Sequence, residues 1–346
     1  MKRWYLVMLM VIGFTTLYAE DGNIKISGDF DGDVWYDFQT GESYNSHDLG
    51  VTITKEFSED VKVNLAISAT TEDTAGEAIY PPVGLVTSNQ RWTNIAFDGA
   101  WLEFNLVGLS WIVGDLAYQF GTFNYYYYKL RKSVITPEQY VRGIQINKMV
   151  YDSLDLGFFI GALDDEKGSR EGGLILTYKN TTEKDFKIES QTIFTLKKID
   201  FDTIINAGVE FKVKKNFFDL KFDLGYMKKS DSSGLNFLVE SNFDFDKYYI
   251  STSVYKKLDD DKVLDFIPDE DYFIYVEPGY KINGNFTIGL PLEYHKYDLV
   301  SNYWIVPTLY ITPKEDVECW LWAQAVLDKD TKDKTYYIGS EIIFNF

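Results

Sequence analysis

Aromatic residues near the end of this sequence recur at a spacing that would place their rings side by side. Trp304 and Tyr310, and then Trp320 and Trp322, alternate with aliphatic and small residues. In a strand, residues two apart point to the same face. Flat rings in such a row stack on the apolar faces of sugars and similar solutes. The candidate binding residues are therefore Trp304, Tyr310, Trp320 and Trp322, and Tyr337 and Trp101 are further candidates that could join them.

Residue types that carry covalent or metal chemistry are scarce. His47 lies beside Asp48, at the end of a polar stretch, 41–47, that we predict to be the first loop. His295 lies beside Lys296, and neither histidine has the spacing of a Ser-His-acid site. The single cysteine, Cys319, cannot form an internal disulfide, and no cluster of His and Cys suits zinc. We expect no catalytic residue, no metal and no cofactor.

The charge of the chain excludes one class of partner. The formal net charge is −19, and without Lys2 and Arg3 it becomes −21, with 32 cations against 53 acids. Such a chain repels nucleic acid. The acidic stretches at 164–166 and 259–261 fit no dedicated calcium loop, so solvated charge is the expectation there.

The elements that must position these residues are strands. In the last eleven residues, 336–346, every second residue lies on one face, which is largely apolar and contains Ile342, Phe344 and Phe346. The residues between them form a mostly polar face. This length suits a tilted strand that crosses a bilayer, about 9–11 residues. Similar alternation along the chain predicts about eighteen strands, with sixteen as the fallback. The phase flips at Asp98-Gly99, where a bulge would keep 91–106 as one strand.

The end of the chain resembles the terminal strand of bacterial outer-membrane β-barrels, which finish with alternating hydrophobics and a final Phe. The resemblance implies an all-β fold: a transmembrane antiparallel barrel with short periplasmic turns and longer extracellular loops. A mean hydropathy of −0.20 and 17% aromatic residues agree with it, because barrel strands average near zero and carry aromatic girdles. The alternative is a soluble antiparallel sandwich, which shows the same alternation.

The N-terminal segment reads as a signal peptide. Lys2 and Arg3 precede an apolar stretch at 4–17, and Leu17-Tyr18-Ala19 is a plausible cleavage site. We expect residues 1–19 to be removed and residues 20–346 to form a single barrel domain in the bacterial outer membrane.

Residues 118–137 resemble the third loop of general porins, which folds into the barrel and narrows it. This segment carries Tyr125, Tyr126, Tyr127, Tyr128, Lys129, Arg131 and Lys132. These residues would face acids on the wall, such as Asp115, Glu103, Glu210 or Glu240, and rings of charge of this kind set ion selectivity. In the alternative, the tyrosines form a girdle and the cations lie among lipid headgroups.

The resemblance implies a porin: a channel, not an enzyme, for passive diffusion of small hydrophilic solutes, with a lumen that prefers cations. The row of aromatic residues is similar to the sugar slide of maltoporin-type channels, which makes a sugar-selective channel one alternative, although girdle tryptophans are commoner. An adhesin, a structural surface barrel and a barrel lipase or protease are the others. The implied partners are outer-membrane lipid, lipopolysaccharide and small solutes, and a homotrimer is one option for assembly.

Overall fold

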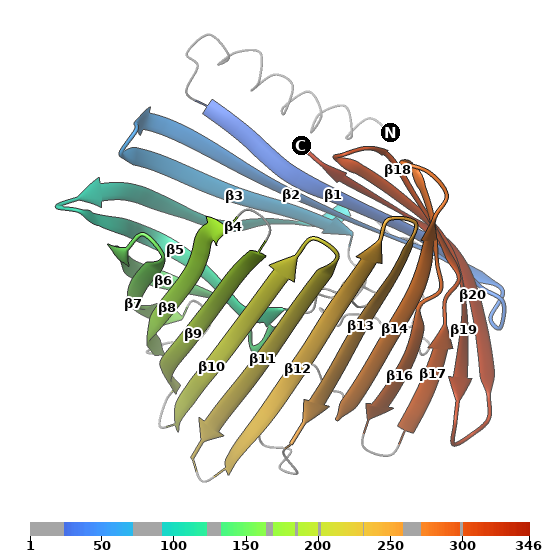
Figure 1. The fold of residues 1–346 in the computed structure, drawn as a ribbon. Coiled ribbons are helices and arrows are strands. Elements are labelled where there is room, and N and C mark those ends of the chain that lie inside the picture. Colours follow the sequence, from blue (N-terminus) through green and yellow to red (C-terminus); the bar gives the residue numbers. More distant parts are fainter. Residues whose placement is uncertain are drawn as a thin grey trace.

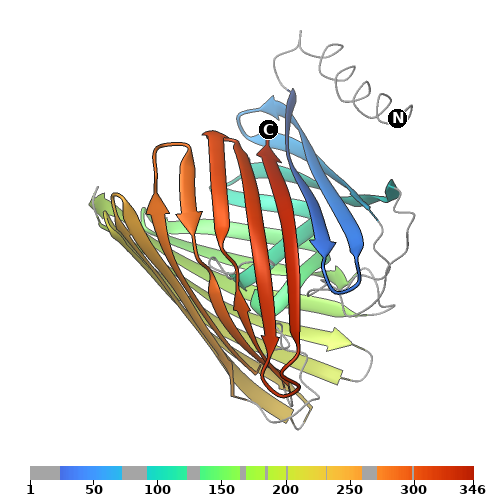
Figure 2. The ribbon, with the colours of Figure 1, turned by 90° about the vertical axis from the view of Figure 1, so that its right-hand side faces the viewer.

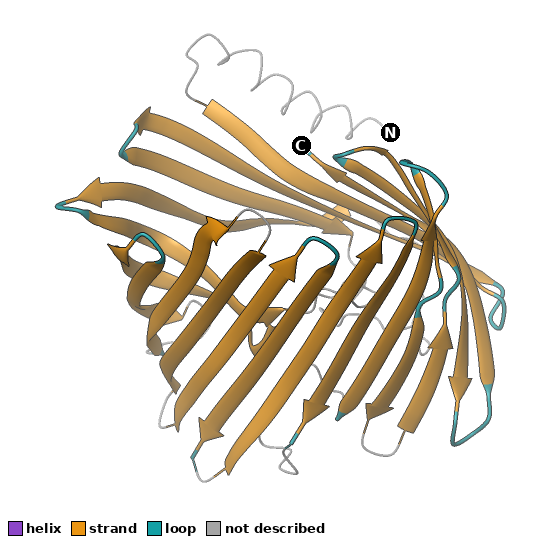
Figure 3. Cartoon of the chain, viewed as in Figure 1, coloured by secondary structure: helices purple, strands orange, loops and turns teal. Residues whose placement is uncertain are grey.

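The computed structural model describes residues 24–71, 92–122, 133–163, 169–183, 186–199, 202–230, 232–258, 271–297 and 300–346. The expected signal peptide lies outside these ranges. The described part consists of strands joined by turns (Figure 3), and none of it is a helix that is long and apolar enough to cross a membrane.

Strand segments follow one another along the chain, each antiparallel to its partners. The first ten are β1 (Ile24–Asp37), β2 (Glu42–Ser58), β3 (Val61–Thr71), β4 (Trp92–Leu106), β5 (Leu109–Thr122), β6 (Ser133–Tyr151), β7 (Leu154–Leu163), β8 (Arg170–Glu183), β9 (Phe186–Ile199) and β10 (Asp202–Lys215). The others are β11 (Phe218–Lys229), β12 (Ser232–Phe245), β13 (Tyr248–Lys257), β14 (Tyr272–Lys281), β15 (Phe286–Gly289), β16 (Leu292–Tyr297), β17 (Val300–Ile305), β18 (Thr308–Lys314), β19 (Val317–Asp328) and β20 (Lys334–Asn345).

The sheet closes into a barrel (Figure 1). The closing contact pairs β1 with β20, and Figure 2 shows these two strands side by side. Segments β15 and β16 both pair with β14, and β17 and β18 both pair with β19, so each pair forms one spanning strand. The twenty segments therefore make eighteen spanning strands, which confirms the predicted number. A closed ring leaves no strand edge to be satisfied inside a bilayer.

Alternation in the sequence gives the barrel two unlike faces. On β11, Phe222 and Leu224 point outward and are exposed, whereas the alternate residues Lys221 and Asp223 are buried inside. The same contrast runs around the ring. An apolar outer skin suits lipid, and the polar inner wall lines a lumen.

Prolines cause the two breaks in the strands. Pro291 separates β15 from β16, and Pro307 separates β17 from β18. The Pro291 carbonyl accepts a hydrogen bond from Val306 N–H at 2.9 Å, but proline has no N–H to return. The Val306 carbonyl is instead satisfied by Thr308 Oγ1, which donates to it at 3.0 Å.

The predicted bulge at Asp98-Gly99 is confirmed. Segment β4 is one strand, and its register with β3 shifts between Ala66 and Ile67. Gly99 has a φ of 149°, a backbone conformation that residues other than glycine rarely adopt.

Two predicted loops are shorter than expected. Residues 42–47 belong to β2, so His47 is not in the first loop; it pairs with Gly32, and its ring lies 6.1 Å from that of Phe30. Backbone pairing with β1 outweighs the polar composition of this stretch. In the predicted loop 118–137, residues up to Thr122 and from Ser133 onward are strand.

Candidate functional site in the barrel lumen

The hairpin of β5 and β6 reaches across the lumen. Its register shifts between Tyr118 and Phe120 and again between Phe120 and Thr122, and such bulges bend a strand. Both strands approach β10 and β11, and β6 also approaches β12, although these strands lie four or more places away around the ring. Residues 125–132, which carry the predicted tyrosines and cations of the constriction, lie outside the described ranges.

Two of the predicted wall acids, Glu210 and Glu240, lie together on the wall that this hairpin approaches. Lys221 Nζ lies 3.0 Å from Asp223 Oδ2, 3.3 Å from Glu240 Oε2 and 3.8 Å from Glu210 Oε2. A second lysine, Lys212, lies 2.8 Å from Glu210 Oε1. Two lysines thus face three carboxylates, so one formal negative charge remains on this wall.

The other two predicted wall acids lie on opposite faces. Glu103 is in the lumen, where its Oε1 accepts hydrogen bonds from Trp101 Nε1 at 2.8 Å and Asn64 Nδ2 at 2.9 Å. Asp115 is on the outer face of β5, because Leu116 next to it carries the inner face. There it pairs with Arg142 Nε at 2.7 Å, so it does not belong to the lumen.

A single carboxylate on β14 gathers three tyrosines. Glu277 Oε1 accepts from Tyr249 Oη at 2.5 Å and from Tyr310 Oη at 2.8 Å, and its Oε2 accepts from Tyr275 Oη. The chain makes room for this cluster with glycine: a Cβ on Gly289 would lie 2.1 Å from Glu277 Oε1. Sequence reasoning missed Glu277, although Tyr275 two residues earlier shares its face.

The predicted row of aromatic residues lies on the inner face. Trp304, Trp320, Trp322 and Tyr337 are buried there, and the ring of Tyr310 meets that of Trp320 edge-on at 5.2 Å. Trp101 is on the same face but far around the ring, on β4. The phase inferred from the sequence is therefore right, whereas a role in binding sugar stays a prediction.

His295 is inside the wall next to this row. It is fully buried, with its Nε2 at 2.8 Å from Glu293 Oε2 and its ring 4.1 Å from that of Trp304. The geometry is that of a packed polar pair.

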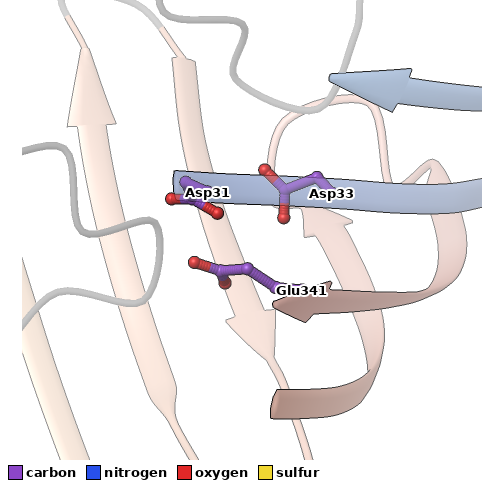
Figure 4. Close-up of side chains that lie close together, drawn as sticks. All are labelled: Asp31, Asp33 and Glu341. Atoms are coloured by element: carbon purple, nitrogen blue, oxygen red, sulfur yellow. The ribbon is translucent and has the colours of Figure 1, made fainter. Parts of the chain in front are cut away.

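A second acidic surface lies where the barrel closes. Asp31 and Asp33 on β1 and Glu341 on β20 place carboxylate oxygens within 4.8 Å of one another (Figure 4). In the register of the two strands, Asp48 on β2 lies directly opposite Asp31 on β1. No Lys or Arg occurs from residue 26 to residue 54 or from residue 335 to the end of the chain. Sequence reasoning missed this surface, although an aspartate at every second position from 29 to 33 was a readable signal.

The two acidic walls differ in exposure. Asp223 and Glu240 are fully buried, whereas Asp48 is exposed and Asp31, Asp33 and Glu341 are partly exposed. Three close carboxylates are also the group of described residues that could share a metal ion, but acids gather without one, and nothing else there points to a metal. What this wall offers is negative potential open to the lumen.

Comparison with known proteins places the fold. No protein-family model and no curated protein matches the sequence. Solved structures match along nearly the whole chain. Acinetobacter baumannii OccAB3 has 12% identity, with 93% of this chain and 99% of that chain covered and a TM-score of 0.58. Pseudomonas aeruginosa OpdK, solved with vanillate, has 10% identity, 94% and 99% coverage and a TM-score of 0.59.

A third structure agrees with these two. A BenF-like porin from Pseudomonas fluorescens Pf-5 has 9% identity, 93% and 98% coverage and a TM-score of 0.59. At such identities the likeness concerns the fold alone. With its eighteen strands, apolar skin and polar lumen, this chain has the fold of the bacterial outer-membrane porins.

Proposed function

We propose that this protein is an outer-membrane channel through which small hydrophilic solutes diffuse passively, with cations favoured over anions. The barrel and its inward hairpin support a constricted pore. The observation that carries the ion preference is the wall of β20, β1 and β2, where Asp31, Asp33, Asp48 and Glu341 share the inner face. They lie in the stretches 26–54 and 335–346, whose sequences contain no lysine or arginine.

These acids would select ions through the electric field that they create in a narrow pore. Rings of carboxylates attract cations and repel anions, because the pore walls focus the field of each charge. The opposite wall contributes little, since Lys212 and Lys221 offset most of its charge. OpdK was solved with vanillate, an aromatic carboxylate. An anion of that kind would be repelled by the open acids here, so we infer a different solute for this channel.

Reversal potentials in a planar bilayer test this proposal. With a salt gradient across the membrane, the wild type should give a potential of the sign expected for a cation-preferring pore. Neutralising the open wall with Asp31→Asn, Asp33→Asn and Glu341→Gln should move that potential toward zero. A matched control removes three exposed acids from the turns outside the pore: Glu59→Gln, Asp152→Asn and Glu315→Gln. If both triple variants behave alike, the open wall does not set selectivity.

A sugar-selective channel is the second candidate, favoured by the inner-face position of the aromatic row. Linear oligosaccharides should then block the ion current in a concentration-dependent way. Trp320→Ala and Trp322→Ala should weaken the block, while Leu321→Ala on the outer face should not. A current that sugars leave unchanged rules this candidate out.

A further inference from the structure

Phe120 is the residue at which the inward hairpin meets the far wall. It is 1% exposed and belongs to one apolar cluster with Leu238 on β12, Tyr255 on β13 and Phe273 on β14. Strand β5 lies seven places from β12 around the ring, which is about 34 Å along the wall at the usual strand spacing. Because the hairpin also approaches β10 and β11, we place Phe120 on the lumen side of this cluster rather than on the ring of strands.

The backbone delivers Phe120 to that position. Register shifts flank it on both sides, and between them it still pairs with Thr136 on β6. The hairpin therefore stays paired while it turns inward. Its approach to β10, β11 and β12 brings it to the wall on which Phe120 finds its apolar partners.

The partners on that wall are unusual for a pore. Leu238 lies on the inner face between Asn236 and Glu240, where the other inner positions of β12 are mostly polar or glycine. An apolar residue on a water-facing wall costs free energy unless another apolar group covers it. Phe120 belongs to the same buried cluster as Leu238, Tyr255 and Phe273, and Ile193 on β9 is a further member.

We propose that Phe120 is a positioning residue that latches the β5–β6 hairpin to the apolar patch formed by Leu238, Tyr255 and Phe273. The latch rests on the proposed channel function and adds to it an explanation of how the hairpin is held in the lumen. It holds the constriction in place by apolar burial, next to a wall whose charges are already paired. The hairpin then occupies the side of β10 to β12, and solutes pass along the open acidic wall of β20, β1 and β2.

Single-channel recording and proteolysis of three variants test the latch. Phe120→Ala removes the phenyl ring, Leu238→Ala removes its partner on the far wall, and Phe158→Ala removes an exposed ring from the outer face as a control. Loss of a buried ring should lower the ratio of latched to displaced hairpin by roughly 100-fold. Phe120→Ala and Leu238→Ala should therefore both show a higher conductance level than the wild type. Phe120→Leu should restore the wild-type level.

The second readout does not depend on conduction. Trypsin has three sites in the segment between β5 and β6, at Lys129, Arg131 and Lys132. A hairpin released from the wall is a less constrained protease substrate, so folded Phe120→Ala should be cut at these sites faster than the wild type and Phe158→Ala, as followed on gels. Folding is checked first by the heat-dependent gel shift and by sheet circular dichroism.

The outcomes separate the two ideas. Wild-type conductance and wild-type cleavage rates in folded Phe120→Ala and Leu238→Ala overturn the latch and leave the channel standing. Absence of conductance from the wild type and from every variant overturns the channel. Faster cleavage at the three sites would then still show that Phe120 fastens the hairpin.

Discussion

Replacing Gly289 by alanine should destabilise the barrel by about 3 kcal/mol, because the new methyl group would occupy the place of a hydrogen-bonded carboxylate oxygen. A Cβ at Gly289 would lie 2.1 Å from Glu277 Oε1, 2.7 Å from the ring of Tyr310 and 2.9 Å from Tyr249 Oη. That oxygen accepts both phenol hydrogen bonds, at 2.5 Å and 2.8 Å. Moving it breaks two bonds to a charged acceptor, each worth about 1.5 kcal/mol.

Urea unfolding of the refolded barrel in lipid vesicles measures this loss. The matched control is Gly284→Ala in the turn between β14 and β15, where a Cβ meets nothing within 4 Å. In a protein that already carries Glu277→Ala, Gly289→Ala should lower the free energy of unfolding by much less, because the carboxylate with which the new methyl group collides is absent. The explanation fails if Gly289→Ala unfolds at the same urea concentration as Gly284→Ala. It also fails if the full loss persists without Glu277.

Two further stability predictions concern other inner-wall contacts. Thr308→Val should cost about 1–3 kcal/mol in the same urea assay, because the Val306 carbonyl loses its hydroxyl donor beside Pro291, while Thr308→Ser should stay near wild type. Lys221→Met should cost about 3–5 kcal/mol at pH 7, because Asp223 and Glu240 are fully buried and lose their nearest ammonium group. That second loss should shrink in urea titrations at low pH, where protonation removes the charge repulsion; an equal loss at both pH values would contradict it.

The inward or outward direction of most strand residues was predictable from the sequence. Period-two alternation assigns Trp304, Trp320 and Trp322 to the inner face because the residues between them are apolar enough to face lipid. The bulge at Asp98-Gly99 was predictable for the same reason, since it is where the alternation changes phase. Both inferences use only the nearest neighbours along the chain.

Contacts between strands were not predictable in this way. Tyr249 and Tyr310 lie 28 and 33 residues from Glu277 in sequence, and only the registers of β13, β14, β15 and β18 bring them together. Asp115 shows the other difficulty. It was assigned to the wall as an acid near a predicted constriction, but the phase of β5 is carried by Gly114 and Leu116, so its carboxylate points outward to Arg142.

The acids on the wall of β10 to β12 are more deeply buried than those on the wall of β20, β1 and β2. This difference in burial could not be predicted from the sequence. Glu240 lies at 0% exposure beside Lys221, whereas Asp33, on a strand with alternating aspartates of its own, is partly exposed on the inner face. An acid that is buried beside a lysine adds little to the potential that a passing ion meets, and a more exposed acid adds more. The formal charge of the chain therefore predicts the sign of the proposed ion preference but not its location. The location proposed here follows from which half of the ring the β5–β6 hairpin approaches.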